Sequence, residues 1–243
     1  MTRPIRCALV IPRDYPAYMS WVRAGAIVEG WIRRVQAWFV RETGHTFDYD
    51  YRILYSNRNI YELALDELDG CSLAPVPEGQ GLAWGVLWSL LRDEIGWSTT
   101  DDNRYWTVVV GAGGWAGGGL YPAANGGNVG VATCGDWGLR YEGTGQPDPC
   151  CMQIWGEGLC TADPAGCFGH ELLHAMKVDC HNPVVDTDDV LSDTQRVALV
   201  QNNADYLYPP TPTRPAAGLL PVVAAGLVLG VVVAASNRKR EVA

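Results

Sequence analysis

The spacing of apolar residues predicts a strand, a long helix and a second strand in the first part of the chain. Residues 5–11 form a short apolar run that ends at Pro12, a pattern typical of a buried strand. Over residues 19–41 the apolar residues recur at helical spacing instead, so we expect a helix that packs across a sheet. Gly44 ends this helix, and the alternating segment 46–55 indicates the second strand.

The central part of the chain predicts further helices and strands. Segments 60–68 and 82–95 have helical patterns and flank a proline- and glycine-rich loop at 70–81. Residues 104–110, which are rich in valine and aromatic residues, form the clearest strand of the chain. Residues 128–134 indicate another strand, which we expect at the edge of the sheet.

The next segments predict a long loop and two late helices. Residues 135–166 are rich in glycine, proline and cysteine and show little periodicity, so we expect an irregular loop. A helix is expected at 167–178, and the Asn-Pro pair at 182–183 marks its exit. A last helix is expected at 192–204, where the serine at its start would be the N-cap.

These elements divide the chain into four parts. Residues 1–208 predict an α+β domain built on a mixed, twisted sheet, and residues 209–215 form a proline-rich linker. Residues 216–236 carry no charge and are long enough for one transmembrane helix. A buried core helix is the alternative, but the linker separates this segment from the domain. The basic residues of 237–243 mark the cytoplasmic side, so we expect a single-pass protein of the cell membrane whose domain is extracytoplasmic.

Charge and aromatic content narrow the class of function. The formal net charge of -9 disfavours contact with phosphate backbones, so no nucleic-acid partner is expected. Hydrophobic residues make up 48% of the chain, and its 10 tryptophans and 11 tyrosines suit a core with an aromatic-lined cleft.

The eight cysteines favour an oxidising compartment. None of them forms a C-x-x-C pair, so a separate zinc finger is not expected. Five lie between positions 150 and 180, where disulfides would hold the loops around the late helix, although the sequence leaves their pairing open. The apolar run at 5–11 is too short for a secretory signal. Either the start is mis-assigned or processed, or the C-terminal segment directs insertion, in which case a cytoplasmic domain also agrees with the sequence.

Three of the four histidines lie on the first late helix or directly after it. His170 and His174 are four residues apart, so on a helix they share one face and can bind one zinc ion. Glu171 stands beside them, where a carboxylate can take a proton from zinc-bound water. An ordinary amphipathic helix with two surface histidines is the alternative, but His181 follows closely. The cluster therefore predicts a zinc hydrolase.

The order of elements, with H-E-x-x-H on a late helix, resembles the zincin metallopeptidases, and more narrowly a metzincin-like group of largely uncharacterised microbial enzymes. The resemblance covers about residues 5–208 and implies a zincin-like fold, in which an edge strand above the zinc, here expected at 128–134, binds substrate by strand addition. It is carried by the helix exit at 38–47, the Gly-Gly-Trp-Ala-Gly-Gly segment, the histidine motif, Asp189-Val190-Leu191 and Asp205-Tyr206.

The chain departs from the metzincin pattern H-E-x-x-H-x-x-G-x-x-H in three places. Lys177 stands where the glycine belongs, and Cys180 occupies the position of the third ligand, with His181 one residue later. No methionine follows His181, so Leu191 would take the place of the usual methionine in the turn below the metal.

His181 is our choice for the third zinc ligand, because a turn absorbs one inserted residue easily and a neutral imidazole suits zinc. Asp189 is the alternative, since residues 186–189 loosely resemble the Gly-Thr-x-Asp of the aspzincin peptidases and residues 203–206 echo a later stretch there. Asp179 and Cys180 stay open as ligands, with Cys180 favoured as a disulfide partner.

The resemblance implies a membrane-anchored zinc endopeptidase that hydrolyses peptide bonds of a peptide or protein substrate. Zn2+ would polarise the scissile carbonyl and activate a water, with Glu171 as general base. Tyr206 or Tyr208 would be the candidate to assist the oxyanion. The alternative is a catalytically inactive zincin-fold protein with a binding or structural role at the surface. An intact Glu171 argues against an inactive binding module, whereas the histidine cluster does not exclude a structural protein.

Overall fold

The chain divides into residues 1–210 and residues 211–243. In the part that the structure describes, no helix is long and apolar enough to cross a membrane. The expected transmembrane segment 216–236 and the tail 237–243 lie outside that part, so the membrane anchor stays a prediction. The computed structural model describes residues 2–13, 15–59, 68–69, 72–73, 92–94, 96, 104–111, 118–120, 130–149, 151–152, 157–178 and 190–210.

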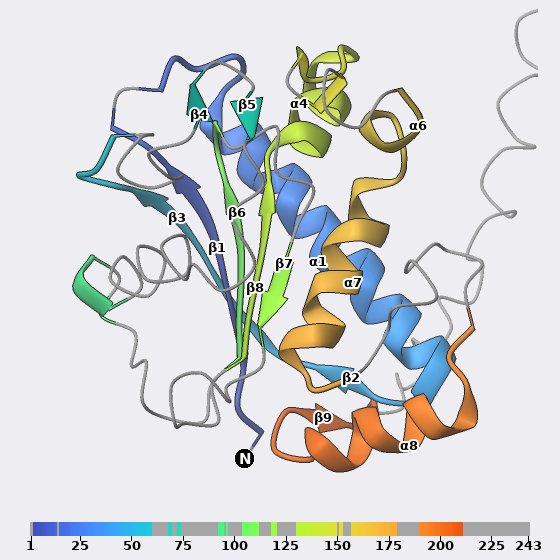
Figure 1. The fold of residues 1–243 in the computed structure, drawn as a ribbon. Helices are drawn as coiled ribbons and strands as arrows, with labels where there is room; N and C mark the ends of the chain where they lie inside the picture. Colours follow the sequence, from blue (N-terminus) through green and yellow to red (C-terminus); the bar gives the residue numbers. More distant parts are fainter. Residues whose placement is uncertain are drawn as a thin grey trace, which may run out of the picture. The chain divides into compact units, whose positions relative to one another are not determined.

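A five-stranded mixed sheet forms the centre of residues 1–210 (Figure 1). The order of its strands is β3 (Tyr49–Tyr55), β1 (Ile5–Ile11), β6 (Arg104–Val109), β8 (Gly130–Gly135) and β7 (Gly118–Leu120). The first four are parallel to their neighbours, and β7 runs antiparallel to β8. Every residue of β6 and β8 is buried, which explains why these segments are largely apolar rather than alternating.

Helix α1 (Trp21–Thr43) covers one face of the sheet together with α7 (Pro164–Ala175), the helix that carries the histidine motif. Between the two helices, the ring of Trp31 lies edge-on to that of Phe168, with centroids 5.7 Å apart. Phe168 in turn stacks on Trp106 of β6, with centroids 3.7 Å apart. The indole Nε1 of Trp106 donates to the carbonyl oxygen of Phe168 at 2.7 Å. These contacts fix the motif helix against the sheet.

The predicted mixed sheet and motif helix are confirmed. The predicted α+β class is corrected, because it implies that helices and strands occupy separate parts of the chain. Helix α1 connects the parallel neighbours β1 and β3, so the molecule is a mixed α/β structure. As predicted, α1 ends at Gly44, whose φ of 71° is left-handed. Helix α8 (Asp193–Asn202) also forms as predicted, with Ser192 as its N-cap in a complete capping box.

The expected second strand is in fact two strands with different partners. Residues Thr46–Phe47 form β2, which pairs antiparallel with β9 (Leu207–Tyr208), whereas β3 pairs with β1. The chain changes partner at Asp48, whose carbonyl oxygen accepts the amide of Ile5 at 2.8 Å. Phe47 is fully buried against Phe39 and Trp106. The spacing of apolar residues could not show this change of partner strand, because apolar and polar residues alternate across residues 46–55 without a break.

The prediction of an irregular loop at 135–166 is wrong. The segment contains helices α4 (Trp137–Thr144) and α6 (Glu157–Cys160), and α7 begins within it. Two of the glycines that suggested a loop, Gly138 and Gly143, lie against close neighbours. A Cβ added to Gly138 would lie 2.2 Å from the Cβ of Pro164, and one on Gly143 would lie 1.8 Å from the Cε of Met19. Helix α4 therefore has glycines because its neighbours approach too closely for side chains.

Two smaller predictions are also corrected. The strand expected at 128–134 is not at the edge: β8 lies between β6 and β7, so β7 is the edge strand. Leu68–Asp69 forms a strand, β4, paired with Ser72–Leu73 (β5), where the end of a helix was expected. Residues 60–67 and most of the helix expected at 82–95 lie outside the described residues, and Arg92 and Asp93 are helical.

A buried polar cluster lies where β8 gives way to α4. Asp136 is fully buried, and its Oδ2 accepts a 2.8 Å hydrogen bond from the hydroxyl of Tyr18. Arg140 lies over the ring of Tyr18 and donates to the hydroxyl of Tyr15 at 3.2 Å. Burial raises the pKa of Asp136 to about 6. The cluster thus joins the segment before α1 to the start of α4.

Candidate active site

The motif helix begins with strong local signals. Asp163 is its N-cap and accepts the amide of Ala165 at 3.0 Å, and Pro164 occupies the first turn, where its missing N–H costs nothing. The helix then runs along β8 so closely that a Cβ on Gly130 would lie 1.9 Å from the carbonyl oxygen of Ala175. It also contacts the edge strand β7. The motif helix therefore lies beside the edge of the sheet (Figure 1).

The structure brings the two predicted zinc ligands of this helix together. The Nε2 atoms of His170 and His174 lie 3.2 Å apart, and the two rings are nearly perpendicular at 89°. Two nitrogens bound to one tetrahedral zinc ion at about 2.0–2.1 Å lie about 3.3 Å from each other. The separation of the two nitrogens therefore matches that of two zinc ligands, although one ring can also donate a hydrogen bond to the other at this distance.

The other predicted ligands lie outside the described residues: His181, the alternative Asp189, and the open candidates Asp179 and Cys180. Among the residues that the structure does describe, no group of three or more histidine, cysteine and acidic side chains is placed to hold a metal ion. The third ligand therefore stays a prediction.

Glu171, the predicted general base, is largely buried on the same helix, with 8% of its surface exposed. Burial in the apolar surroundings of the helix raises its pKa to about 7. A carboxyl group with a pKa near neutrality can both accept and return a proton at physiological pH, as a general base requires.

The chain leaves the motif helix earlier than predicted, at Ala175 rather than at 178. Lys177 has a φ of 66°, the only left-handed value at a non-glycine residue in the described part of the chain. The amide of Val178 donates to Leu173 O and that of Lys177 to His174 O, both at 3.0 Å. This is a Schellman turn, in which the left-handed position usually holds glycine. Lys177 thus adopts the conformation expected of the glycine that it replaces in the metzincin pattern.

Two buried polar side chains that sequence reasoning missed fix this turn. Asn203, next to α8, donates through Nδ2 to the carbonyl oxygen of Met176 at 2.7 Å and to that of Leu199 at 2.9 Å. Its Oδ1 accepts the Nε of Arg104 at 3.2 Å, and both side chains are about 1% exposed. The only sequence signal was a charged residue at the start of a strand that is otherwise apolar.

The tyrosines proposed for the oxyanion have structural partners instead. Tyr206 is 1% exposed and packs in the core, with the guanidinium of Arg104 5.1 Å from its ring centroid. Tyr208 lies in β9 and its hydroxyl donates to Asp48, which raises the pKa of Tyr208 to about 12. These contacts favour a packing role for both.

Leu191, expected in the place of the methionine, is buried in the same core as the motif helix. Its amide donates to Oε2 of Glu42 at 3.1 Å, and Arg196 Nη2 lies 3.3 Å from the same oxygen. Although burial raises the pKa of Glu42, hydrogen bonds from Arg41, Leu191 and Arg196 outweigh it and leave that pKa lowered. The ionised Glu42 therefore anchors the segment that enters α8.

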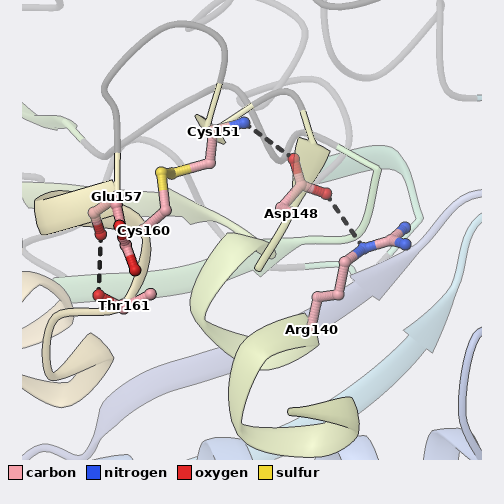
Figure 2. The surroundings of a disulfide bond; sticks show 6 residues. All are labelled: Arg140, Asp148, Cys151, Glu157, Cys160 and Thr161. Atoms are coloured by element: carbon pink, nitrogen blue, oxygen red, sulfur yellow. Dashed lines mark hydrogen bonds and ion pairs between the residues drawn. A yellow bond between two sulfur atoms is a disulfide. The ribbon is translucent and has the colours of Figure 1, made fainter. Parts of the chain in front are cut away.

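One disulfide lies just before the motif helix, in the region where disulfides were predicted. It joins Cys151 to Cys160 (Figure 2). The amide of Cys151 donates to Asp148, and Asp148 in turn pairs with Arg140 at 3.1 Å. The disulfide therefore belongs to the same polar network that begins at Asp136.

Two thiols lie beside Glu171. Cys134 of β8 is buried, and Cys167 stands one helical turn before Glu171. Burial, together with Cys167 and Glu171, raises the pKa of Cys134. Of the described cysteines, Cys7 and Cys134 are buried free thiols.

Comparison with known proteins adds no assignment. No family model matches the chain, and neither a curated protein nor a solved structure does. The function is therefore inferred from the chain's own residues and their geometry.

Proposed function

We propose that this protein is a zinc-dependent peptidase with a zincin-like fold. The observation that carries the proposal is the convergence of His170 and His174 at the spacing of two zinc ligands. Two further features support it. The motif lies on a helix beside the edge strand β7, and Glu171 is buried on the same helix with a pKa of about 7.

The side chains divide the work of peptide hydrolysis. His170 and His174 would hold the zinc ion, with His181 or Asp189 as the expected third ligand. The bound ion would act as a Lewis acid that polarises the scissile carbonyl and acidifies a water molecule. Glu171 would accept the proton of the attacking water and deliver it to the nitrogen of the departing amine. The edge strand β7 would align an extended peptide along the site by strand pairing.

The test is hydrolysis of unfolded casein by the full chain, with the zinc content measured on the same sample. We expect zinc-dependent cleavage that Glu171→Gln lowers by at least about 100-fold, since general-base catalysis contributes about that much. Zinc should still bind to this variant. His170→Ala and His174→Ala should lose both zinc and activity.

A matched control is His45→Ala, because His45 is the one histidine outside the motif region and its Nδ1 lies 2.8 Å from the carbonyl oxygen of Thr43. It should keep both zinc and activity. Zinc binding without cleavage of any unfolded substrate would favour the inactive binding or structural protein. Absence of zinc from the native chain would refute the proposal.

A further inference from the structure

We propose that Asn203 and Arg104 are positioning residues, which hold His174 in the place where it binds zinc. The proposal rests on the function proposed above and adds to it two residues from outside the motif helix. It starts from the positions of the two histidines along that helix. His170 lies in the helix interior, whereas His174 is followed by only one more helical residue, Ala175.

The place of His174 makes it sensitive to the end of the helix. The last carbonyl groups of a helix have no partner within the helix, so the last turn frays unless other groups bind them. If this turn opened, the ring of His174 would move relative to that of His170, and zinc would have to order the pair on binding. The 3.2 Å separation of the two Nε2 atoms therefore depends on the groups that cap this helix end.

A chain of hydrogen bonds leads from the end of α8 to the backbone of His174. The Nδ2 of Asn203 donates to the carbonyl oxygen of Met176 at 2.7 Å. The other end of the same peptide group, the amide of Lys177, donates to the carbonyl oxygen of His174 at 3.0 Å. One peptide group thus connects the side chain of Asn203 with the backbone of the predicted zinc ligand.

Arg104 determines how the amide group of Asn203 is oriented. A guanidinium can only donate, so the atom of Asn203 that lies 3.2 Å from the Nε of Arg104 is the oxygen. The nitrogen of the amide then faces the carbonyl oxygens of Met176 and Leu199. Arg104 stands opposite Gly130 in the register of β6 and β8, and a Cβ on Gly130 would lie 2.9 Å from the Cδ of Arg104. The absence of a side chain at Gly130 leaves room for the arginine.

Burial keeps this arrangement closed. The side chains of Asn203 and Arg104 are both about 1% exposed. Breaking one of their hydrogen bonds would leave a polar group without a partner in the protein interior, which costs free energy. The positive charge of Arg104 strengthens its bond to Asn203 further. The end of the motif helix is therefore held by groups that do not exchange readily with water.

The experiment measures the zinc affinity of the full chain by competition with a chelator, and cleavage of unfolded casein on the same samples. Asn203→Asp keeps the oxygen that accepts from Arg104, but it replaces the donor with an oxygen that faces two carbonyl oxygens. We expect the dissociation constant of zinc to rise about 10-fold or more, as it does when a metal ligand loses an outer partner. Zinc well above this constant should restore most of the cleavage, because a positioning residue takes no part in the chemical step.

Two control variants separate this role from a general effect on the fold. Asn202 is exposed, and its Nδ2 lies 3.5 Å from the carbonyl oxygen of Lys177, so Asn202→Asp should leave the zinc affinity unchanged. Ile5→Val removes one methylene group from the buried core on β1. It should lower the unfolding temperature without a change in zinc affinity.

Arg104→Met gives the answer if Asn203→Asp does not fold. It leaves the donors of Asn203 in place but removes the guanidinium that orients them, so it should also weaken zinc binding. Unchanged zinc affinity in a folded Asn203→Asp or Arg104→Met chain would overturn the positioning role and leave the peptidase proposal standing. An equal loss of affinity in Ile5→Val would overturn it as well.

The two proposals can fail separately. Zinc binding that Asn203→Asp weakens, in a wild-type chain that cleaves no substrate, would support the positioning role and count against the peptidase. A wild-type chain that binds no zinc would refute both.

Discussion

At the scale of single residues, the turn after the motif helix holds a lysine in a conformation that usually belongs to glycine. The metzincin pattern has glycine where this chain has Lys177, and Lys177 still adopts the left-handed conformation. For a residue other than glycine, the left-handed conformation costs about 1–2 kcal/mol of free energy. The hydrogen bonds of the Schellman turn and the contact of Asn203 with Met176 keep the turn in place against that cost.

We predict that Lys177→Gly unfolds at a higher urea concentration than Lys177→Ala, with a free energy of unfolding about 1 kcal/mol larger. Both variants lose the lysine side chain, so their difference reports the backbone alone. The converse change, Gly44→Ala, should cost about 1 kcal/mol, because Gly44 has a φ of 71° and open space around the missing Cβ. Equal stability of the two Lys177 variants would contradict this account.

The chemistry of the candidate site could be predicted from the sequence only where residues are close along the chain. The spacing of His170 and His174 fixes their helical face, and the structure places their nitrogens together. Arg104 and Asn203 are 99 positions apart, and no local pattern pairs them. The third ligand depends on the path of the chain after Lys177, which spacing does not determine.

At the scale of elements, the sequence predicted what periodicity encodes and failed where packing decides. The long α1 and the buried β1 and β6 follow directly from apolar spacing. Helix α4 did not, because its glycines were taken as loop signals although they are contacts with Pro164 and Met19. The split of β2 from β3 also escaped, since a strand's partner is not encoded in its own alternation.

At Gly130, β8 lies directly against the backbone at the end of the motif helix. We predict that Gly130→Ala lowers the free energy of unfolding by about 3 kcal/mol, because its Cβ would collide with the backbone oxygen of Ala175. Gly30→Ala, in the middle of α1 with open space around it, should instead raise that free energy by about 1 kcal/mol. Chemical denaturation measures both. A well-tolerated Gly130→Ala would show that the two elements can separate easily.

At the scale of the whole molecule, the buried Asp136 links the segment before α1 to the sheet and to α4, so its ionisation affects the stability of the fold. Its pKa is about 6 in the folded state, above the ordinary value of 3.8. The folded chain therefore binds this proton more tightly than the unfolded chain does. Its stabilising contribution is present at low pH and is lost as the pH rises through about 6.

We predict that the free energy of unfolding falls between about pH 4 and pH 7 by up to about 3 kcal/mol from this group, since one pKa unit corresponds to about 1.4 kcal/mol. Asp136→Asn, which can still accept the hydroxyl of Tyr18, should remove this fall. Urea unfolding at a series of pH values measures it. The control Asp193→Asn changes a carboxyl group that is 97% exposed and should leave the slope unchanged. If the free energy of unfolding still falls with pH in Asp136→Asn, other titrating groups cause the fall.

The pairing of β2 with β9 has a consequence for synthesis on the ribosome. Phe47 and its neighbours emerge early, but the strand that pairs with them contains Leu207 and is among the last of this unit to be made. The amide of Arg3 likewise donates to the carbonyl oxygen of Asp205. In a nascent chain, β2 therefore has no partner strand until β9 has left the ribosome. The pairing of β2 with β9 can therefore form only after residue 208 has been translated.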